Sequence, residues 1–549
     1  MKVTKGSLVA PLFFAALGIA CFASQLGAAL PWALATVALA MVGWAGRQGR
    51  AGTSPIALAT LSYAAWVALS TLALSPAYTS AGLYHPVLLI LSFLVIRRLT
   101  AGAERWAAIS TMALGGILAF WGLAQLAWLG MARAHAMLET PATYATVLNL
   151  VLVPMVAFTA AGHRNALVLG SIVVASAGLF AADSRGGLLG LAAGIGCAVF
   201  LASRTKLLRP RHLALALALV AAGAVLVTAL RALPSSQQTE RPTATERSES
   251  SISRLELFAL ALKTWRERPW LGHGYLTYEY AFEKGRAGVP SYQRTQATSF
   301  VHNDYLQTLS ELGLIGVAAF LAFVWLPLWM AYRRIQSLET QHQLVVVACA
   351  SALASMAIHA LVDFPFYVPI CLVLYGCFLG ALEKRVCTLE RANTILPRYA
   401  GRWFWAIRAG ASMVALVLLL RPVSAEYLAG RGLRDAAAGK GQRAALMLGM
   451  ARSIEPADWR YHWYAGQFWD AQAVDSGRRE AAQLAAVAYA AGFAANPLEV
   501  RNLLGMISVH RRHRQLMDAP ADPGTMQQWE AQALALAPLN PAVRRELGR

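Results

Sequence analysis

A short polar segment followed at once by an apolar run carries the side chains of this sequence that are best suited to chemistry. His302 and Asn303 begin the segment, Glu311 lies near its end, and the apolar run Leu314–Leu328 is long enough to start a membrane span. Polar groups pressed against a bilayer-crossing helix are costly unless they are solvated or hydrogen-bonded. Such clusters are usually kept because they act on something at the membrane surface, although His302 and Asn303 could also simply cap the helix.

Two arginines elsewhere in the chain extend this hypothesis. Arg185 separates two apolar segments, and Arg254 opens an amphipathic stretch. One arginine at a membrane boundary is commonly an interfacial anchor. Two guanidinium groups at one level, however, could hold a pyrophosphate through paired hydrogen bonds. A histidine beside them could remove a proton near neutral pH, so Arg185, Arg254 and His302 together predict a site for a diphosphate and an activated hydroxyl.

The elements that position these residues follow from composition. The chain has 549 residues, of which 57% are hydrophobic and only 14% are charged. This balance excludes a soluble globular protein and predicts an all-α, polytopic membrane protein. Apolar windows of membrane-spanning length predict about twelve or thirteen transmembrane helices, at residues 8–26, 29–46, 55–75, 84–97, 106–130, 142–161, 166–183, 186–202, 212–230, 313–332, 343–361, 366–382 and 403–421. We expect the first of them to be a retained span.

The charges between these windows predict the orientation. Alternate loops hold about nineteen lysines and arginines, whereas the intervening short loops hold only Arg133 and Arg185. Basic loops stay on the cytoplasmic side, so we expect the N-terminus in the cytoplasm of a bacterial inner membrane. The net charge of +20 therefore reflects topology, and it does not indicate nucleic-acid binding because the cations form no single patch.

This orientation divides the chain into four parts. Residues 1–230 and 313–421 are predicted to be the two groups of transmembrane helices, 231–312 a periplasmic catalytic loop, and 422–549 a periplasmic domain. Within the loop, Pro234–Ser253 is rich in Ser, Thr, Gln, Glu and Pro and is interpreted as flexible. An amphipathic helix is expected from Arg254 to just before Pro269, followed by a glycine-punctuated turn around His273.

The C-terminal part is Ala-rich and predicted to be helical. Its segments end at Glu455-Pro456, Asn496-Pro497 and Asn540-Pro541, a period of about forty residues that is similar to tetratricopeptide-type repeats. Such a solenoid would dock a partner or a glycan, and an ordinary helical bundle is the alternative. All six cysteines lie in spans or a cytoplasmic loop, so we expect neither a disulfide framework nor a cysteine metal site.

Four ordered segments resemble the O-antigen ligase and O-antigen polymerase superfamily, which includes bacterial O-linking oligosaccharyltransferases. The resemblance covers roughly residues 55–385 and excludes the C-terminal repeats. The matching segments are Ser184-Arg185-Gly186-Gly187, the stretch from Arg254 through Pro269-Trp270-Leu271-Gly272-His273-Gly274, His302-Asn303-Asp304-Tyr305-Leu306 with Glu311-Leu312-Gly313, and, more weakly, His359-Ala360-Leu361-Val362-Asp363-Phe364-Pro365.

The resemblance implies an integral-membrane glycosyltransferase that takes a glycan from undecaprenyl diphosphate at the periplasmic face, without a cofactor or a metal ion. It implies Arg185 and Arg254 as essential arginines that bind the diphosphate and His302 as the general base. Further candidates for substrate binding are Asn303, Tyr305, Glu311, Tyr144 and His273. The family's Asn-Pro-Asn-like stretch is replaced here by Glu139-Thr140-Pro141-Ala142-Thr143-Tyr144, which leaves Glu139 and Tyr144 as acceptor-side or lipid-side candidates.

Several functions share this core. The acceptor could be lipid A–core, as in an O-antigen ligase of lipopolysaccharide biosynthesis, a protein, or a growing glycan. Direct displacement at the anomeric carbon would invert its configuration, and no glycosidase-like carboxylate pair is evident. A transporter or flippase for a lipid-linked sugar is the alternative from another class, but it predicts internal repeats and ionisable residues at mid-span. Neither feature is clear in this sequence, and a binding scaffold is a more distant alternative.

Overall fold

The computed structural model describes residues 8–26, 29–46, 54–75, 79–232, 244–290, 298–387 and 402–548. These residues form helices and no strand, which confirms the predicted all-α class. The helices before the long loop are α1 (Val9–Leu26), α2 (Ala29–Gly46), α3 (Pro55–Leu69), α4 (Ala81–Ile96), α5 (Ala101–Ala127), α6 (Pro141–Ala160), α7 (Ala166–Ala181), α8 (Arg185–Ser203) and α9 (Pro210–Ala232). After the loop come α12 (Asp304–Arg334), α13 (Thr340–His359) and α14 (Pro369–Val386).

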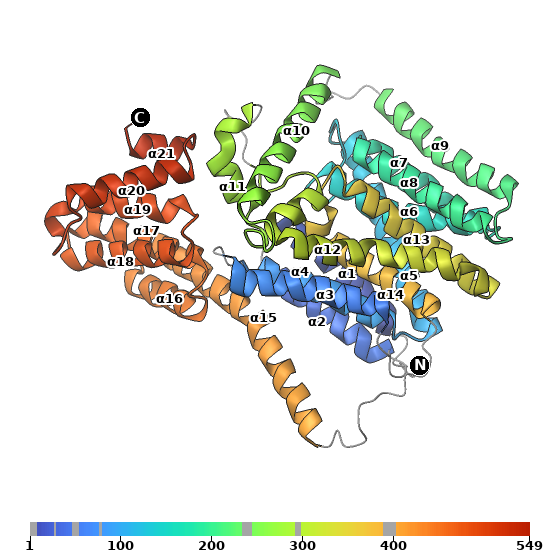
Figure 1. The fold of residues 1–549 in the computed structure, drawn as a ribbon, viewed down its shortest axis with the longest axis horizontal. Helices are drawn as coiled ribbons and strands as arrows, with labels where there is room; N and C mark the ends of the chain where they lie inside the picture. Colours follow the sequence, from blue (N-terminus) through green and yellow to red (C-terminus); the bar gives the residue numbers. More distant parts are fainter. Residues whose placement is uncertain are drawn as a thin grey trace.

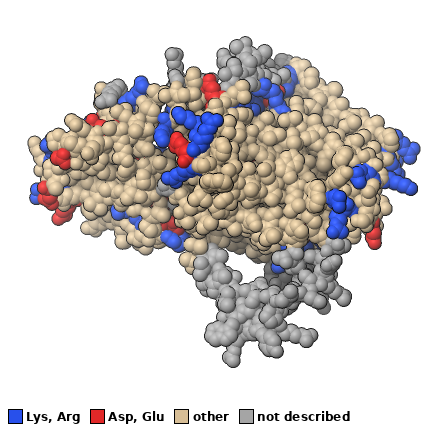
Figure 2. Space-filling view, in the orientation of Figure 1, with Lys and Arg blue, Asp and Glu red and all other residues tan. Residues whose placement is uncertain are grey.

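The protein is a multi-pass membrane protein, as predicted. Seven helices of the described residues are long and apolar enough to cross a bilayer, and four shorter apolar helices accompany them. Each of the thirteen predicted apolar windows falls on a helix of the structure. Lys and Arg side chains gather at the right-hand end of the bundle and over the α10–α11 region, with a broad band of other residues between them (Figure 2). A band of this kind is what a bilayer requires of a protein surface.

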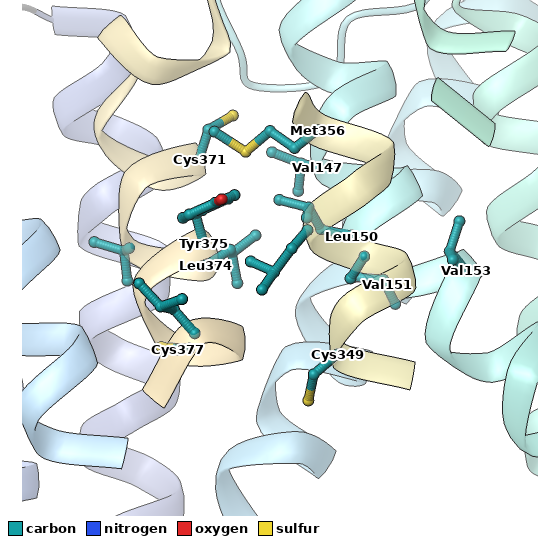
Figure 3. Packing of buried hydrophobic residues seen from close by; sticks show 14 of the residues in the cluster. Val147, Leu150, Val151, Val153, Cys349, Met356, Cys371, Leu374, Tyr375 and Cys377 are labelled. Atoms are coloured by element: carbon teal, nitrogen blue, oxygen red, sulfur yellow. The ribbon is translucent and has the colours of Figure 1, made fainter. Parts of the chain in front are cut away.

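Helices α6 and α13 form the centre of the bundle. The hydrophobic windows of α6 and α13 are 83% and 78% buried, whereas that of α9 is 22% buried. Helix α13 packs against α6, α8 and α14. Figure 3 shows side chains such as Leu150, Met356 and Tyr375 filling the space between these helices. A central helix pair of this kind gives residues at its ends fixed positions, because packed interiors move little.

The long loop contains two helices that lie across the end of the bundle, α10 (Ala244–Glu267) and α11 (Tyr278–Gly285) (Figure 1). Helix α10 begins ten residues before Arg254, so the second half of the stretch interpreted as flexible is helical instead. Ala, Glu and Arg in that half are adequate helix formers, and they extend the amphipathic helix toward its N-terminus. The first half, up to residue 243, lies outside the described residues.

Helix α12 is broken at Gly313, whose φ of 66° and ψ of −169° are not helical. The loop segment after α10 fills the break. Leu314 N donates to Pro269 O at 2.9 Å, and Gly274 N donates to Glu311 O at 2.8 Å. The backbone groups that the break frees from α12 are therefore satisfied by the loop, as a membrane-associated helix requires. This exchange ties the long loop to the start of the span.

Replacing Gly313 by alanine is expected to lower the thermal unfolding midpoint by about 5–10 °C and to impair any activity that depends on the loop. The residue has a left-handed φ, and an added Cβ would lie 2.3 Å from Trp270 O. Gly196→Ala is the matched control because nothing lies within 4 Å of its added Cβ. Equal unfolding midpoints for the two variants, measured in the same detergent, would contradict this role of Gly313.

The C-terminal part is a separate group of antiparallel helices on the left of Figure 1. It comprises the second half of α15 (Arg402–Ala437), α16 (Gly441–Ile454), α17 (Trp459–Ser476), α18 (Arg479–Ala495), α19 (Val500–Arg512), α20 (Pro523–Leu536) and α21 (Pro541–Glu546). Helix α17 packs against α18, and α18 packs against α19. The group has small cores of its own, one of which includes Leu448, Tyr461 and Phe468.

Three equivalent turns recur in this C-terminal group. The side chains of Asp458, Glu499 and Asn540 each cap the next helix by accepting a hydrogen bond from the backbone N–H two residues on. The sequence predicted the third turn at Asn540-Pro541, but Asn540 is the capping residue, equivalent to Asp458 and Glu499. The third turn therefore lies three residues earlier, at Ala537-Pro538. The turns thus repeat along the chain, and a tetratricopeptide-type fold stays a prediction.

Contacts join the C-terminal group to the rest of the molecule. Asn496 Nδ2 donates to the Tyr280 hydroxyl of α11 at 3.0 Å. Glu426 of α15 accepts a hydrogen bond of 2.8 Å from Ala29 N at the start of α2. The group therefore lies on the same side of the helix bundle as the long loop.

Candidate active site

His302 lies directly before the first turn of α12, in a backbone conformation that few residues adopt. Its φ is 57°, in the left-handed region, which costs a non-glycine residue on the order of 1 kcal/mol. Asn303 follows as the N-cap, and its side chain accepts from Leu306 N at 3.0 Å and donates to Leu361 O at 2.9 Å. Asp304 N also donates to Ala360 O at 2.9 Å. These bonds join the start of α12 to the turn after α13.

The turn after α13 supplies a carboxylate for His302. Asp363 Oδ1 lies 3.4 Å from His302 Nδ1, and Asp363 Oδ2 lies 3.7 Å from His359 Nε2. The other ring nitrogen of His359 lies 2.8 Å from Thr146 Oγ1 on α6. A line of polar side chains therefore runs from α6 to the surface. His302 is its outermost member, since its side chain is 26% exposed against 7% for Asp363 and 1% for His359.

The charge of Asp363 is set by these neighbours. Burial raises the pKa of the Asp363 carboxyl, but the hydrogen bond from His302 and the positive charges of His359, His302 and Arg254 outweigh it. The net result is a pKa below the usual aspartate value. Asp363 is therefore an anion near neutral pH, and it can hold His302 through Nδ1. The Nε2 nitrogen of His302 then remains for contact with a substrate.

The two candidate arginines approach the same point from different elements. The charge of Arg254, on α10, acts on both Asp363 and His359. Arg185 is the first residue of α8, and its neighbour Gly186 lies so close to His359 that an added Cβ would be 2.7 Å from His359 Nε2. Ser184 caps this helix by accepting from Gly187 N at 3.1 Å. The segments that carry Arg185, Arg254 and His302 thus meet around the His359–Asp363 pair. We call this end of the helix bundle the loop face.

Asp183 precedes the N-cap of α8 just as His302 precedes the N-cap of α12. Its φ is 48°, so both residues take the left-handed conformation immediately before a capped helix. Backbone strain of this kind persists where the surrounding structure holds it, and it clusters at functional sites. The helix N-terminus that begins with Arg185 also carries a partial positive charge, which favours an anion nearby.

An aromatic surface borders His302. The Phe300 and Phe364 rings stack with centroids 4.0 Å apart. The His302 ring packs against Phe364 in an edge-to-face arrangement, with 5.1 Å between the ring centroids. This packing limits the rotation of the imidazole, because aromatic contacts of this type have preferred geometries. The sequence hypothesis did not include these aromatic residues.

The other predicted substrate-binding residues are engaged in the structure of the protein itself. Both carboxylate oxygens of Glu311 accept hydrogen bonds, from the N–H groups of Leu276 and Tyr278 and from two further side chains, those of Gln307 and Tyr367. Glu311 therefore holds the loop after its glycine turn. The exposed fraction of Glu311 is 1%, so the side chain is buried.

The remaining candidates have similar structural roles. The Tyr305 hydroxyl donates to Ala357 O at 3.0 Å, and one ring nitrogen of His273 lies 2.9 Å from Thr264 O. The Tyr144 hydroxyl donates to Leu118 O at 3.2 Å between α5 and α6. Asn303 is the N-cap of α12 described above. The structure thus brings together the segments that carry Arg185, Arg254 and His302, and it holds Glu311, Tyr305, His273 and Tyr144 in packing contacts.

Three residues of the site were missing from the sequence hypothesis: Thr146, His359 and Asp363. The weak fourth segment of the resemblance contained two of them, and its His-x-x-x-Asp spacing placed both on one side of a helix end. Thr146 carried no such signal, because threonine in an apolar helix commonly bonds the backbone of the preceding turn. Thr146 also makes that bond, to Ala142 O at 3.1 Å.

A comparison with protein families bears on this region. Residues 170–321 match the family model described as O-antigen ligase. This part of the chain is similar to that family. The match supports membership of the O-antigen ligase superfamily, as the resemblance implied. No curated protein matches the chain.

The matched region includes three of the site residues, Arg185, Arg254 and His302. It also includes α10 and the break at Gly313. His359 and Asp363 lie beyond its end, as does the C-terminal group of helices. The match supports a role in glycan transfer at a membrane, and it does not specify the donor or the acceptor. Among the described residues, no group of three or more His, Cys, Asp or Glu could hold a metal ion.

Proposed function

We propose that the protein transfers a glycan from undecaprenyl diphosphate to an acceptor hydroxyl. The observation that carries this proposal is the exposed imidazole of His302, held by the buried anion Asp363 at the point where the Arg185 and Arg254 segments meet. An imidazole oriented by a carboxylate is a common arrangement for a general base. Cations beside it suit a donor that departs as a diphosphate.

The mechanism is a single displacement at the anomeric carbon. His302 Nε2 takes the proton from the acceptor hydroxyl as its oxygen bonds to the anomeric carbon. The bond from that carbon to the diphosphate oxygen breaks, and its electron pair leaves with undecaprenyl diphosphate. Arg185 and Arg254 stabilise the negative charge on the leaving group. Because attack occurs opposite the leaving group, the configuration at the anomeric carbon inverts.

Asp363 has a positioning role in this mechanism, since it reaches the substrate only through His302. We expect Asp363→Asn to lower kcat by about 10²-fold or more with a smaller effect on KM, because the amide cannot hold the imidazole as an anion does. The matched control is Asp475→Asn, which changes an exposed aspartate on α17 of the C-terminal group and should leave kcat unchanged. Transfer kinetics over pH 5–8 test this prediction, and unchanged kcat in Asp363→Asn would contradict it.

The same carboxylate predicts how stability depends on pH. The pKa of Asp363 is lowered in the folded protein, so its stabilising contribution is complete above the unfolded pKa and is lost as pH falls through the folded value. We expect the difference in unfolding midpoint between wild type and Asp363→Asn to be present at pH 5 and to shrink as the pH falls below about 4. A difference that disappears between pH 8 and 6 would indicate another titrating group.

We further propose that the loop face and the C-terminal group lie in the periplasm of a bacterial inner membrane. The basic loops at the opposite ends of the helices support this orientation. A reporter that functions only in the periplasm should be active when it is fused after residue 549. Activity of a strictly cytoplasmic reporter at that position would reverse the topology.

The acceptor is tested by a panel. Purified protein in liposomes is given undecaprenyl-diphosphate glycan with lipid A–core, with a pilin-like protein, or alone. We expect lipid A–core to be glycosylated, as in an O-antigen ligase. Glycosylated protein would assign an O-linked oligosaccharyltransferase instead, and lengthened donor glycan would assign a polymerase. The His302→Ala protein is the control for each arm.

A further inference from the structure

A cavity lies far from the loop face, in the opposite half of the helix bundle. It has a volume of about 380 Å³ and is bounded mainly by α5, α6, α13 and α14. Its wall includes Val345 and Cys349 of α13, which precede His359 by fourteen and ten residues. At 1.5 Å per residue, the cavity therefore begins about 15 Å along the helix from His359. It is separate from the candidate active site.

The walls of this cavity are almost entirely apolar. Side chains such as Leu150, Met155 and Phe158 of α6 face Phe378 and Cys377 of α14 across it. Figure 3 shows Cys349 and Cys377 below the closely packed layer of Met356, Leu374 and Tyr375. Apolar cavities of this size accept hydrocarbon rather than ordered water, and the volume is within the range of small-ligand sites.

The cavity is open along the first turns of α5. Ala101, Arg105 and Ala108 line it and are also exposed on the surface of the protein. In a bilayer, a side opening between helices faces the lipid chains. Its outer end meets the first residues of α5, where the chain passes from a loop into the span. A ligand could therefore insert a chain sideways while its polar end stays at the membrane surface.

The polar end of the cavity is positively charged. Glu104 lies 2.9 Å from Lys384 Nζ and 2.7 Å from the Arg385 guanidinium, so its single charge is shared by two cations. Arg105, at the rim, has no ion-pair partner among the described residues. The cavity lining includes Glu104, Arg105 and Arg385, a net charge of +1, and Lys384 adds a further positive charge beside Glu104. This charge favours an anionic group beside an apolar chain.

We propose that this cavity binds an anionic phospholipid. One acyl chain occupies the cavity between α5, α6, α13 and α14, and the phosphate headgroup binds Arg105 and the outer side of Arg385. The combination of a chain-sized apolar space and a cationic rim matches a lipid of this class, whereas a zwitterionic lipid such as phosphatidylcholine would bring a cation of its own beside the rim. The site does not depend on the proposed glycan transfer, because it lies at the other end of the bundle.

The test measures lipid retention on the full-length protein. Protein in detergent is mixed with equal amounts of phosphatidylglycerol and phosphatidylcholine with the same acyl chains, and the retained lipid is counted by native mass spectrometry. We expect a preference of about fivefold or more for phosphatidylglycerol, since each cation near a headgroup contributes on the order of a fivefold factor. Arg105→Gln should reduce that preference to near one.

Two further variants separate this site from general charge effects. Arg211→Gln removes an exposed cation outside the cavity lining, so the preference should stay at the wild-type level. Ala108→Trp fills the opening and should reduce retention of both lipids. Equal retention of the two lipids by wild type, or a wild-type preference in Arg105→Gln, would overturn the proposal. Displacement of phosphatidylglycerol by undecaprenyl phosphate at equal concentration would also overturn it and assign the cavity to the donor's chain.

Discussion

His302→Ala is expected to lower glycan transfer by about 10²–10⁴-fold while the protein stays folded, inserted in the membrane and able to bind the donor. His302 is 26% exposed and contacts Asp363 through one ring nitrogen, so its removal opens no cavity in the core. The loss should fall on kcat, because a general base acts on the acceptor proton in the transition state. Transfer by reconstituted protein, measured together with donor binding, gives both quantities.

The control for this prediction is His163→Ala. His163 is an exposed histidine of the loop between α6 and α7, at the opposite end of α6 from Thr146. We expect transfer within about twofold of wild type in this variant, since surface substitutions have small effects. Near-wild-type transfer by His302→Ala would leave helix positioning as the better account of His302, because its left-handed φ and the adjoining cap would then be its whole role.

Arg185→Ala and Arg254→Ala are expected to weaken donor binding by about ten- to a hundredfold each and to lower turnover as well. A charge-assisted hydrogen bond to a phosphate contributes on the order of 1.5–3 kcal/mol, and this contribution is present before the reaction begins. Lysine at either position should restore only part of the loss, because an ammonium group cannot form the planar paired bonds of a guanidinium. Binding of a labelled donor to the detergent-solubilised variants measures the effect.

Arg266→Ala is the matched control for Arg254→Ala. Arg266 is on the same helix, α10, and is exposed near its C-terminal end, twelve residues or about 18 Å from Arg254. Its removal should leave donor affinity within about twofold of wild type. Equal loss of affinity in Arg254→Ala and Arg266→Ala would indicate a general electrostatic attraction by the loop rather than a defined diphosphate site.

The arrangement of helices was predictable from the sequence to a large extent. Each apolar window corresponds to a helix because, in a bilayer, length and hydrophobicity leave few alternatives to a span. The break inside α12 was visible only as a glycine after Glu311. Its conformation depends on the segment around Trp270, some forty residues earlier in the chain, so local patterns could not predict it.

The candidate site was predictable where charge conflicted with its surroundings. Arg185, Arg254 and His302 stood out because cations and polar groups are unusual at an external membrane boundary. Glu311 and Tyr305 stood out for the same reason, yet the structure uses them to bind the loop and α13. A polar group near a span can be satisfied by a substrate or by the protein, and only the folded chain separates these cases. Nothing in the sequence indicated that Asp363 contacts His302, because the two residues are distant in the chain.

Coupled product formation in proteoliposomes tests the central claim most directly. Purified protein is reconstituted with undecaprenyl-diphosphate glycan and lipid A–core, and both the glycosylated acceptor and the released undecaprenyl diphosphate are quantified. Glycan transfer predicts the two products in a one-to-one ratio for wild type and neither product for His302→Ala. Movement of intact donor across the bilayer without release of undecaprenyl diphosphate would contradict the account and favour a transporter.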